Sequence, residues 1–169
     1  FIGTALAGSL EREGHEVRRL VRDRSQASAR SFYWNPAEAE IDVAGLAGSD
    51  AVVHLEGEGI ASHRWSARRK EHIRTSRVQG TQRLAEALVR TTVRPSVFVC
   101  ASAIGFYGDR GDEALTESSA AGDGFLAEVC RAWEEACQPL SKTGVRVANL
   151  RFGMVLSALG GALPRMLLP

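Results

Sequence analysis

The stretch FIGTALAGSLEREGHEVRRLVRD, residues 1–23, decides the fold class. Ile2, Leu6 and Leu10 recur every four residues, which is the spacing of an apolar helix face, and Gly14 stands where such a helix would end. The apolar residues beyond this glycine predict a short strand. A helix followed directly by a strand is half of a βαβ unit, so we expect a first strand to precede this helix.

The alternation of strands and helices continues along the chain. Apolar runs predict strands at residues 31–36, 50–55, 96–102 and 145–152. Helical spacing predicts helices at residues 66–74, 76–90 and 124–137, and residues 37–49 are expected to form a loop or an irregular helix. Apolar strands separated by helices are typical of a parallel sheet that is covered on both faces. The sequence therefore predicts the α/β class, with a doubly wound parallel sheet.

The expected first strand has a structural role. In a doubly wound sheet this strand is central, and ligands bind at the carboxyl ends of the strands around it. Without it, two neighbouring strands would each carry a row of unpaired backbone groups, at a cost of about 1–3 kcal/mol for each group. We therefore expect residues 1–169 to form one partial domain, incomplete at both ends, that would not fold stably alone.

Composition limits the partners of this protein. The hydrophobic content of 44% is ordinary for a globular protein. The net charge of +1 argues against a dedicated nucleic-acid binder. No apolar run reaches the roughly 18 residues that span a bilayer, so we expect no membrane partner. Two basic clusters, in residues 18–30 and 64–77, suit a small phosphorylated ligand or are solvated surface.

The cysteines and histidines predict no metal site. Cys100, Cys130 and Cys137 form no CxxC pair, and the four histidines are scattered along the chain. An odd number of widely spaced cysteines favours reduced thiols, and hence a cytoplasmic location.

Arg22 carries the cofactor prediction. The residue at the end of the strand that follows the first helix normally meets the adenosine ribose of a bound dinucleotide. An acidic residue there favours a free 2′-hydroxyl, whereas an arginine can hold a 2′-phosphate. Arg22, supported by Arg24 and Arg19, therefore indicates NADP(H) rather than NAD(H), unless this turn is merely solvated. Gly3 would be the last glycine of the dinucleotide-binding turn.

Seven segments carry a family resemblance. They are GHEVRRLVRD, SDAVVHLEGEGI, RW at 64–65, SRVQGT, SVFVCASAIGFYGDRGDE, GDGFLAEVCRAWE and VRVANLRFGMVLSALGGAL. In this order they resemble the extended short-chain dehydrogenase/reductase superfamily of the NAD-dependent epimerase/dehydratase type. Within it they are most similar to the epimerase family protein branch of NADP-dependent oxidoreductases. The resemblance implies a Rossmann-like fold with NADP(H) across the strand ends and a substrate-binding part C-terminal to this chain.

The resemblance implies cofactor-binding roles for particular residues. Gly3 would belong to the pyrophosphate loop, and Arg22 would meet the 2′-phosphate. The backbone of His54 and Leu55 would run beside the cofactor. Glu56 stands where a small residue is usual, and its carboxylate is unfavourable near a phosphate unless it turns away or pairs with an arginine. The residues implied near the nicotinamide are Ser102, Arg151, Gly153, Met154 and Val155.

The catalytic pair of the superfamily is absent. Typical members carry a tyrosine and, four residues later, a lysine that lowers the pKa of the tyrosine. The corresponding helix offers Phe125 with Val129 or, one residue on, Leu126 with Cys130. Neither frame supplies the pair, so the resemblance supports cofactor binding better than any named reaction.

Other residues are candidates for the chemistry. Ala103 occupies the usual serine or threonine position, and the adjacent Ser102 is the first candidate for a hydrogen bond to substrate. Tyr107 is a candidate for proton transfer, and Glu128 and Cys130 are further candidates that could equally be surface and core residues.

Three functions remain open at this stage. The first is an NADP-dependent oxidoreductase that acts on a small carbonyl or alcohol substrate. The second is a non-catalytic NADP(H)-binding sensor or interaction protein, which the missing pair favours. The third, ranked lower for the same reason, is a nucleotide-sugar epimerase or dehydratase. Hydride transfer does not strictly require the pair, because the cofactor carries that chemistry.

Overall fold

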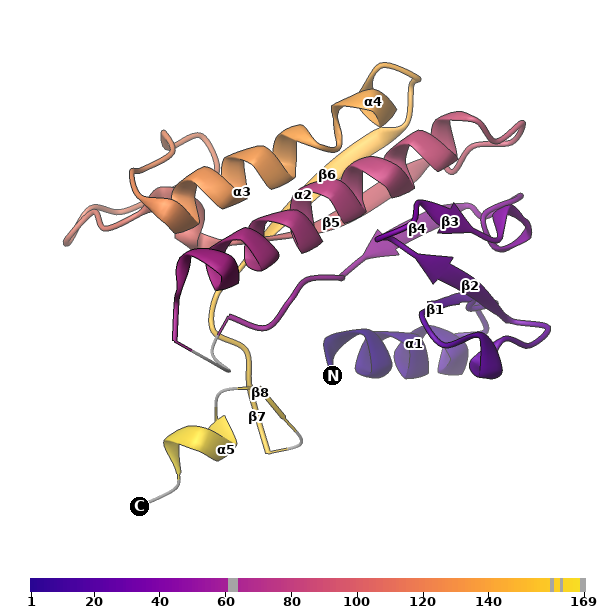
Figure 1. The fold of residues 1–169 in the computed structure, drawn as a ribbon, viewed down its shortest axis with the longest axis horizontal. Coiled ribbons are helices and arrows are strands. Elements are labelled where there is room, and N and C mark those ends of the chain that lie inside the picture. Colours follow the sequence, from indigo (N-terminus) through magenta and orange to yellow (C-terminus); the bar gives the residue numbers. More distant parts are fainter. Residues whose placement is uncertain (61–63, 159, 162, 168–169) are drawn as a thin grey trace.

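The computed structural model describes residues 1–60, 64–158, 160–161 and 163–167 (Figure 1). The helices are α1 (Ile2–Arg12), α2 (Ala67–Val89), α3 (Phe125–Glu135), α4 (Gln138–Ser141) and α5 (Leu163–Met166). The strands are β1 (Arg19–Val21), β2 (Ser31–Asn35), β3 (Glu40–Ile41), β4 (Ala51–His54), β5 (Val97–Ala103), β6 (Arg146–Phe152), β7 (Leu156–Ser157) and β8 (Gly160–Gly161). Three 3₁₀ turns complete the set: η1 (Arg24–Gln26), η2 (Val43–Gly45) and η3 (Ile104–Tyr107).

The parallel strands form two sheets. β1 pairs in parallel with β2, which pairs antiparallel with β3. β4, β5 and β6 form an all-parallel sheet in that order, with Cys100 of β5 beside His54 on one side and Asn149 on the other. Within the described residues β1 and β4 each pair with a single strand, as expected if the strand between them is absent.

The core lies between the β4–β5–β6 sheet and the helices α2, α3 and α4, which cover one of its faces (Figure 1). Leu84, Leu88, Phe98 and Leu140 are almost completely buried there. On the opposite face, Val53 and Leu150 are 39% and 42% exposed. Within the described residues, α2, α3 and α4 therefore cover a single face of this sheet.

Two local expectations need correction. Residues 66–74 and 76–90 form one continuous helix, α2, rather than two. The hydroxyls of Thr75 and Ser76 bond to Glu71 and to the carbonyl of Ile73 one turn earlier, so these side chains do not interrupt the helix. Residues 37–49 include the short strand β3, which follows a tight turn in which Ala39 has a positive φ of 55°.

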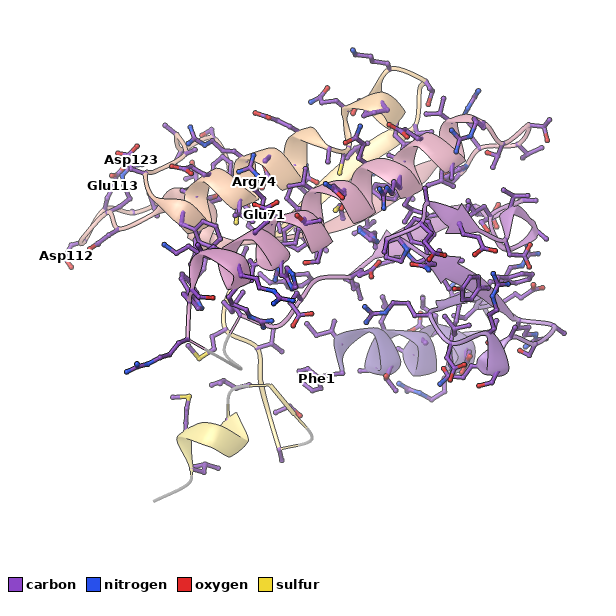
Figure 2. All side chains as sticks on the ribbon, viewed as in Figure 1. Phe1, Glu71, Arg74, Asp112, Glu113 and Asp123 are labelled. Carbon is purple, nitrogen blue, oxygen red and sulfur yellow. The ribbon has the colours of Figure 1, made fainter. Side chains whose placement is uncertain are left out.

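The carboxyl ends of the strands mark the edge where a ligand would bind. α1, α2 and α3 all begin at this edge (Figure 1). The segment between η3 and α3 extends from the same edge and carries Asp112, Glu113 and Asp123 (Figure 2). The loops that follow β4, β5 and β6 therefore determine the candidate site.

Candidate functional site

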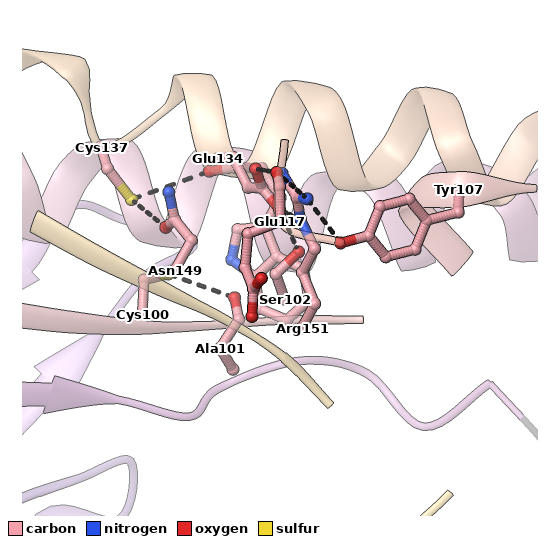
Figure 3. Close-up of polar contacts among 10 residues, drawn as sticks. Cys100, Ala101, Ser102, Tyr107, Glu117, Glu134, Cys137, Asn149 and Arg151 are labelled. Atoms are coloured by element: carbon pink, nitrogen blue, oxygen red, sulfur yellow. Dashed lines mark hydrogen bonds and ion pairs between the residues drawn. The ribbon is translucent and has the colours of Figure 1, made fainter. Parts of the chain in front are cut away.

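Four side chains, from β5, η3, α3 and β6, meet at the carboxyl ends of β5 and β6 (Figure 3). The Ser102 hydroxyl donates to Oε1 of Glu134 over 2.7 Å. Arg151 binds the same carboxylate with two hydrogen bonds of 2.9 Å, from Nε to Oε1 and from Nη2 to Oε2. Its Nη1 donates to the Tyr107 hydroxyl, also over 2.9 Å. Ser102, Tyr107 and Arg151 are thus brought together, and Glu134 joins them.

Arg151 is firmly held in this network. Its guanidinium lies 3.4 Å from the centre of the Phe106 ring, and Nη1 also donates to the carbonyl of Glu117. The Arg151 and Glu134 side chains are only 18% and 14% exposed, and the hydrogen bonds to Glu134 raise the pKa of Arg151. A bidentate pair of this kind fixes geometry as well as charge. It therefore joins β6, α3 and the η3 turn into one rigid unit.

The hydroxyls in this unit point inward. Ser102 is 3% exposed and Tyr107 is 8% exposed. The Ser102 proton is donated to Glu134, so this hydroxyl supports the carboxylate. The phenol oxygen accepts from Arg151, which leaves the Tyr107 O–H proton free to be donated elsewhere.

Sequence reasoning missed Glu134. The helical period does supply a signal, because Glu134 lies four residues after Cys130 and shares its face of α3. That face is directed at the end of β5, since a Cβ on Gly105 would lie 4.0 Å from the Cys130 sulfur. Cys130 itself is buried, and burial raises the pKa of its thiol. Glu128 is exposed in the first turn of α3.

The residues at the two possible positions of the missing tyrosine, Phe125 and Leu126, lie in different surroundings. A Cβ on Gly105 would lie 3.3 Å from the Cβ of Leu126, so Leu126 faces η3. Phe125 instead packs edge-on against Trp65 with ring centres 5.7 Å apart, and the Lys70 ammonium lies 5.3 Å from its ring centre. Among these α3 residues, only apolar groups and a thiol thus face the end of β5.

Arg22 and Glu56 pair at the carboxyl ends of β1 and β4. Nη1 of Arg22 lies 3.5 Å from Oε1 of Glu56, while the other carboxylate oxygen accepts a 3.0 Å hydrogen bond from Trp34 Nε1. The Arg22 side chain is 73% exposed and that of Glu56 is 17% exposed. Glu56 therefore satisfies the expected condition, because its carboxylate pairs with an arginine.

The other arginines of this cluster are already engaged. Arg19 pairs with Glu11 at 3.0 Å. Arg24 pairs with Glu40 and lies 3.8 Å from the centre of the Tyr33 ring. The support expected from these two arginines is therefore directed to neighbouring side chains, and Arg22 is the most exposed guanidinium of the three.

His54 and Leu55 face opposite directions. His54 is 4% exposed, its Nε2 lies 3.0 Å from the Thr81 hydroxyl, and burial lowers its pKa to about 4. Leu55 instead lies beside the start of α1, since a Cβ on Gly3 would be 3.7 Å from its Cδ1. The structure thus brings Gly3 and Leu55 together, while the imidazole belongs to the core.

Gly153, Met154 and Val155 follow β6 at the same edge. Met154 is 68% exposed and Val155 is 37% exposed. The segment leads into the β7–β8 hairpin, where Gly160 and Gly161 pack against the Phe1 ring. The end of this segment therefore lies near the beginning of α1.

These features define a class of protein: a Rossmann-like α/β fold whose strand ends and helix N-termini share one edge. The chain belongs to the NAD dependent epimerase/dehydratase family, whose model matches residues 1–167. This confirms the fold class and the resemblance that the sequence segments carry.

Three known proteins show the extent of the similarity. The epimerase family protein Mb2239 of Mycobacterium bovis is 42% identical over 98% of this chain and 54% of its own length. The crystal structure of a nucleoside-diphosphate sugar epimerase from Corynebacterium glutamicum matches with a TM-score of 0.84 and 44% identity, covering 98% of this chain and 34% of that one. Human epimerase family protein SDR39U1, crystallised with NADPH, matches with a TM-score of 0.84 and 31% identity, covering 99% of this chain and 55% of that one. The chain spans about half the length of the curated relatives that it matches.

Membrane spanning requires a helix that is both long and apolar. Within the part of the chain that the structure describes, no helix meets both conditions.

Proposed function

We propose that this protein is an NADP(H)-dependent oxidoreductase that acts on a small carbonyl or alcohol substrate. The observation that carries the proposal is the exposed Arg22 guanidinium at the carboxyl end of β1. Its partner Glu56 lies 3.5 Å from Nη1 and is 17% exposed, whereas the Arg22 side chain is 73% exposed. The other guanidinium N–H groups of Arg22 would bind a 2′-phosphate, while Nη1 keeps Glu56 paired. The NADPH in the SDR39U1 structure supports the same choice.

The start of α1 fits a pyrophosphate. Its first turn has no side-chain cap and no acidic residue, so its N–H groups are available to an anion. Gly3 adds no side chain there, and Leu55 lies beside it. In this proposal Gly3, Leu55 and the His54 backbone hold the dinucleotide, and Arg22 selects NADP(H). Gly153, Met154 and Val155 cover its nicotinamide end.

The remaining site residues prepare the reaction. Bound NADPH would supply the hydride. Tyr107 would donate its free hydroxyl proton to the substrate oxygen, while Arg151 holds the phenol oxygen in place. Ser102 acts through Glu134, which in turn orients Arg151, so we assign Ser102 a positioning role.

The nucleotide assignment is tested by binding. The full-length protein is titrated with NADPH and NADH, as wild type and as Arg22→Ala. A lost charge-assisted contact of about 1.5 kcal/mol corresponds to at least tenfold weaker NADPH binding, with NADH unchanged. The matched control is Arg90→Ala. Arg90 is an exposed arginine at the C-terminal end of α2, whereas the N-terminal end of this helix lies at the candidate site. A preference for NADH, or equal NADPH binding by Arg22→Ala, would contradict the proposal.

The second candidate is a non-catalytic NADP(H)-binding sensor. Leu126 and Cys130 favour it, because they face the end of β5 where the superfamily uses a tyrosine and a lysine. The two functions are separated by following nicotinamide absorbance with a panel of carbonyl compounds. Tight NADPH binding without reduction of any of these compounds, and hence without oxidation of NADPH, would favour the sensor.

A further inference from the structure

Arg77 of α2 is a half-buried cation without a counter-charge. Its Nη1 donates to the carbonyl of Ile73 over 3.1 Å, and its Cζ lies 5.1 Å from the centre of the Trp133 ring. In the described part of the chain, no carboxylate forms an ion pair with it. Burial lowers the pKa of Arg77, which means that its surroundings disfavour its charge. A guanidinium remains charged, so the protein carries an uncompensated cation here.

The nearest carboxylates are committed to other partners. Glu58 attracts Arg77 but forms its ion pair with Arg69, at 2.8 Å. Glu56 is directed at Trp34 and Arg22. Arg69 also repels Arg77, and the Cys130 thiol is the remaining titratable group that influences it. None of these described groups neutralises the guanidinium.

Nε and Nη2 of Arg77 make no hydrogen bond to the described residues, since Nη1 alone is engaged. Gly57 packs against the guanidinium: a Cβ there would lie 3.2 Å from Cζ, 3.3 Å from Nη2 and 3.5 Å from Nε, so a side chain at residue 57 would crowd the group. Nη1 is already occupied by the Ile73 carbonyl. The Nε–Nη2 pair is the side of arginine that binds a carboxylate through two parallel hydrogen bonds.

The position of Arg77 places it at the candidate site. Its guanidinium lies beside Gly57, which follows β4 at this edge, and 5.1 Å from the centre of the Trp133 ring of α3. Arg77 therefore flanks the region where the nicotinamide end of the cofactor is expected.

We propose that Arg77 binds a carboxylate of the substrate through its Nε–Nη2 edge. The substrate of the proposed reaction is then a small carbonyl or alcohol compound that carries a carboxylate. This inference rests on the proposed function for the reaction, but the anion site itself can be tested without the cofactor.

The test uses malonate as a simple carboxylate and malonamide as its neutral counterpart. Each is titrated into full-length protein at constant ionic strength, and the indole N–H resonance of Trp133 reports binding beside Arg77. We expect malonate to shift this resonance in a saturable way and malonamide to have no effect. Equal effects of both compounds, or none from either, would overturn the proposal.

Three variants make the test specific. Arg77→Gln should weaken malonate binding at least tenfold, whereas Arg77→Lys, which keeps the charge but not the planar fork, should weaken it less. Arg74→Gln, on the exposed side of the same helix (Figure 2), should change nothing. Unchanged malonate binding in Arg77→Gln would refute the assignment. The assignment would also be refuted if inorganic phosphate bound ten times more tightly than malonate and this binding depended on Arg77.

A separate titration with NADPH distinguishes the two proposals. NADPH affinity should stay within twofold of wild type in Arg77→Gln, because the inferred carboxylate contact does not involve the nucleotide. Failure of NADPH binding in the wild type would remove the proposed function and leave the anion site standing. Failure of malonate binding alone would remove only the anion site.

Discussion

His54 should make the stability of this protein depend on pH. The imidazole is 4% exposed, lies 3.0 Å from the Thr81 hydroxyl and stacks on Phe98 with ring centres 6.2 Å apart. Its pKa falls from 6.5 to about 4 because burial disfavours the charged form. Between these values the unfolded state binds more protons than the folded state. The contribution of His54 is therefore complete above pH 6.5 and is lost as the pH falls toward 4.

The size of this effect follows from the two pKa values. At pH 5.5 the imidazole is about nine-tenths protonated in the unfolded chain and almost neutral in the folded one. Folding then loses about 1.4 kcal/mol relative to pH 8. Below pH 4 the loss approaches a limit of about 3.4 kcal/mol, because the free energy changes by about 1.36 kcal/mol over each pH unit between the two pKa values.

Urea unfolding of the full-length protein at pH 8, 7, 6 and 5.5 measures the effect. His54→Gln should be less stable than wild type at pH 8, and this difference should shrink by about 1.4 kcal/mol at pH 5.5. Comparing the two proteins cancels the titration of other groups. His15→Gln, at an exposed histidine, should follow wild type throughout. A difference between His54→Gln and wild type that is constant with pH would refute the reasoning.

Two further predictions concern the packing around the site. Glu134→Ala leaves a guanidinium that is 18% exposed without its carboxylate and should lower the free energy of unfolding by about 3 kcal/mol, measured in urea, whereas the exposed Glu135→Ala should change it little. Gly122→Ala should lower the free energy of unfolding by about 1–3 kcal/mol, because the added Cβ would lie 2.0 Å from the Tyr107 carbonyl oxygen. The control is Gly8→Ala, where the added Cβ meets no atom within 4 Å. Equal thermal unfolding of the two variants would contradict the prediction.

The sequence predicted most elements because their signals are local. The four-residue spacing before Gly14 and the apolar run before Ser102 each describe one helix or strand, and both elements are present. The break expected between residues 66–74 and 76–90 was wrong for a local reason too, since hydroxyls can bond within a helix as well as end it.

The candidate site was harder to predict because its contacts are distant in sequence. Ser102 and Glu134 are 32 residues apart, and Arg151 is 17 residues beyond Glu134. Ser102 and Arg151 were identified through the resemblance, but no periodicity shows that a carboxylate on α3 connects them. The pairing of Arg22 with Glu56 was predicted only as one of two possibilities, because the position of the end of β1 relative to the end of β4 is a property of the folded chain.

The three arginines around the site differ in how their charge is balanced, and this difference separates structure from ligand binding. Arg151 is fully compensated by two hydrogen bonds to Glu134, so an incoming anion would have to break a buried pair at a cost of several kcal/mol. Arg22 has one contact of 3.5 Å to Glu56 through Nη1, and its side chain is 73% exposed, so its other N–H groups can bind a phosphate while Glu56 stays paired. Arg77 has no carboxylate partner among the described residues. An anionic ligand would therefore gain from Arg22 and Arg77 and lose at Arg151, which predicts one anion-binding contact at each end of the candidate site and a rigid support beside it.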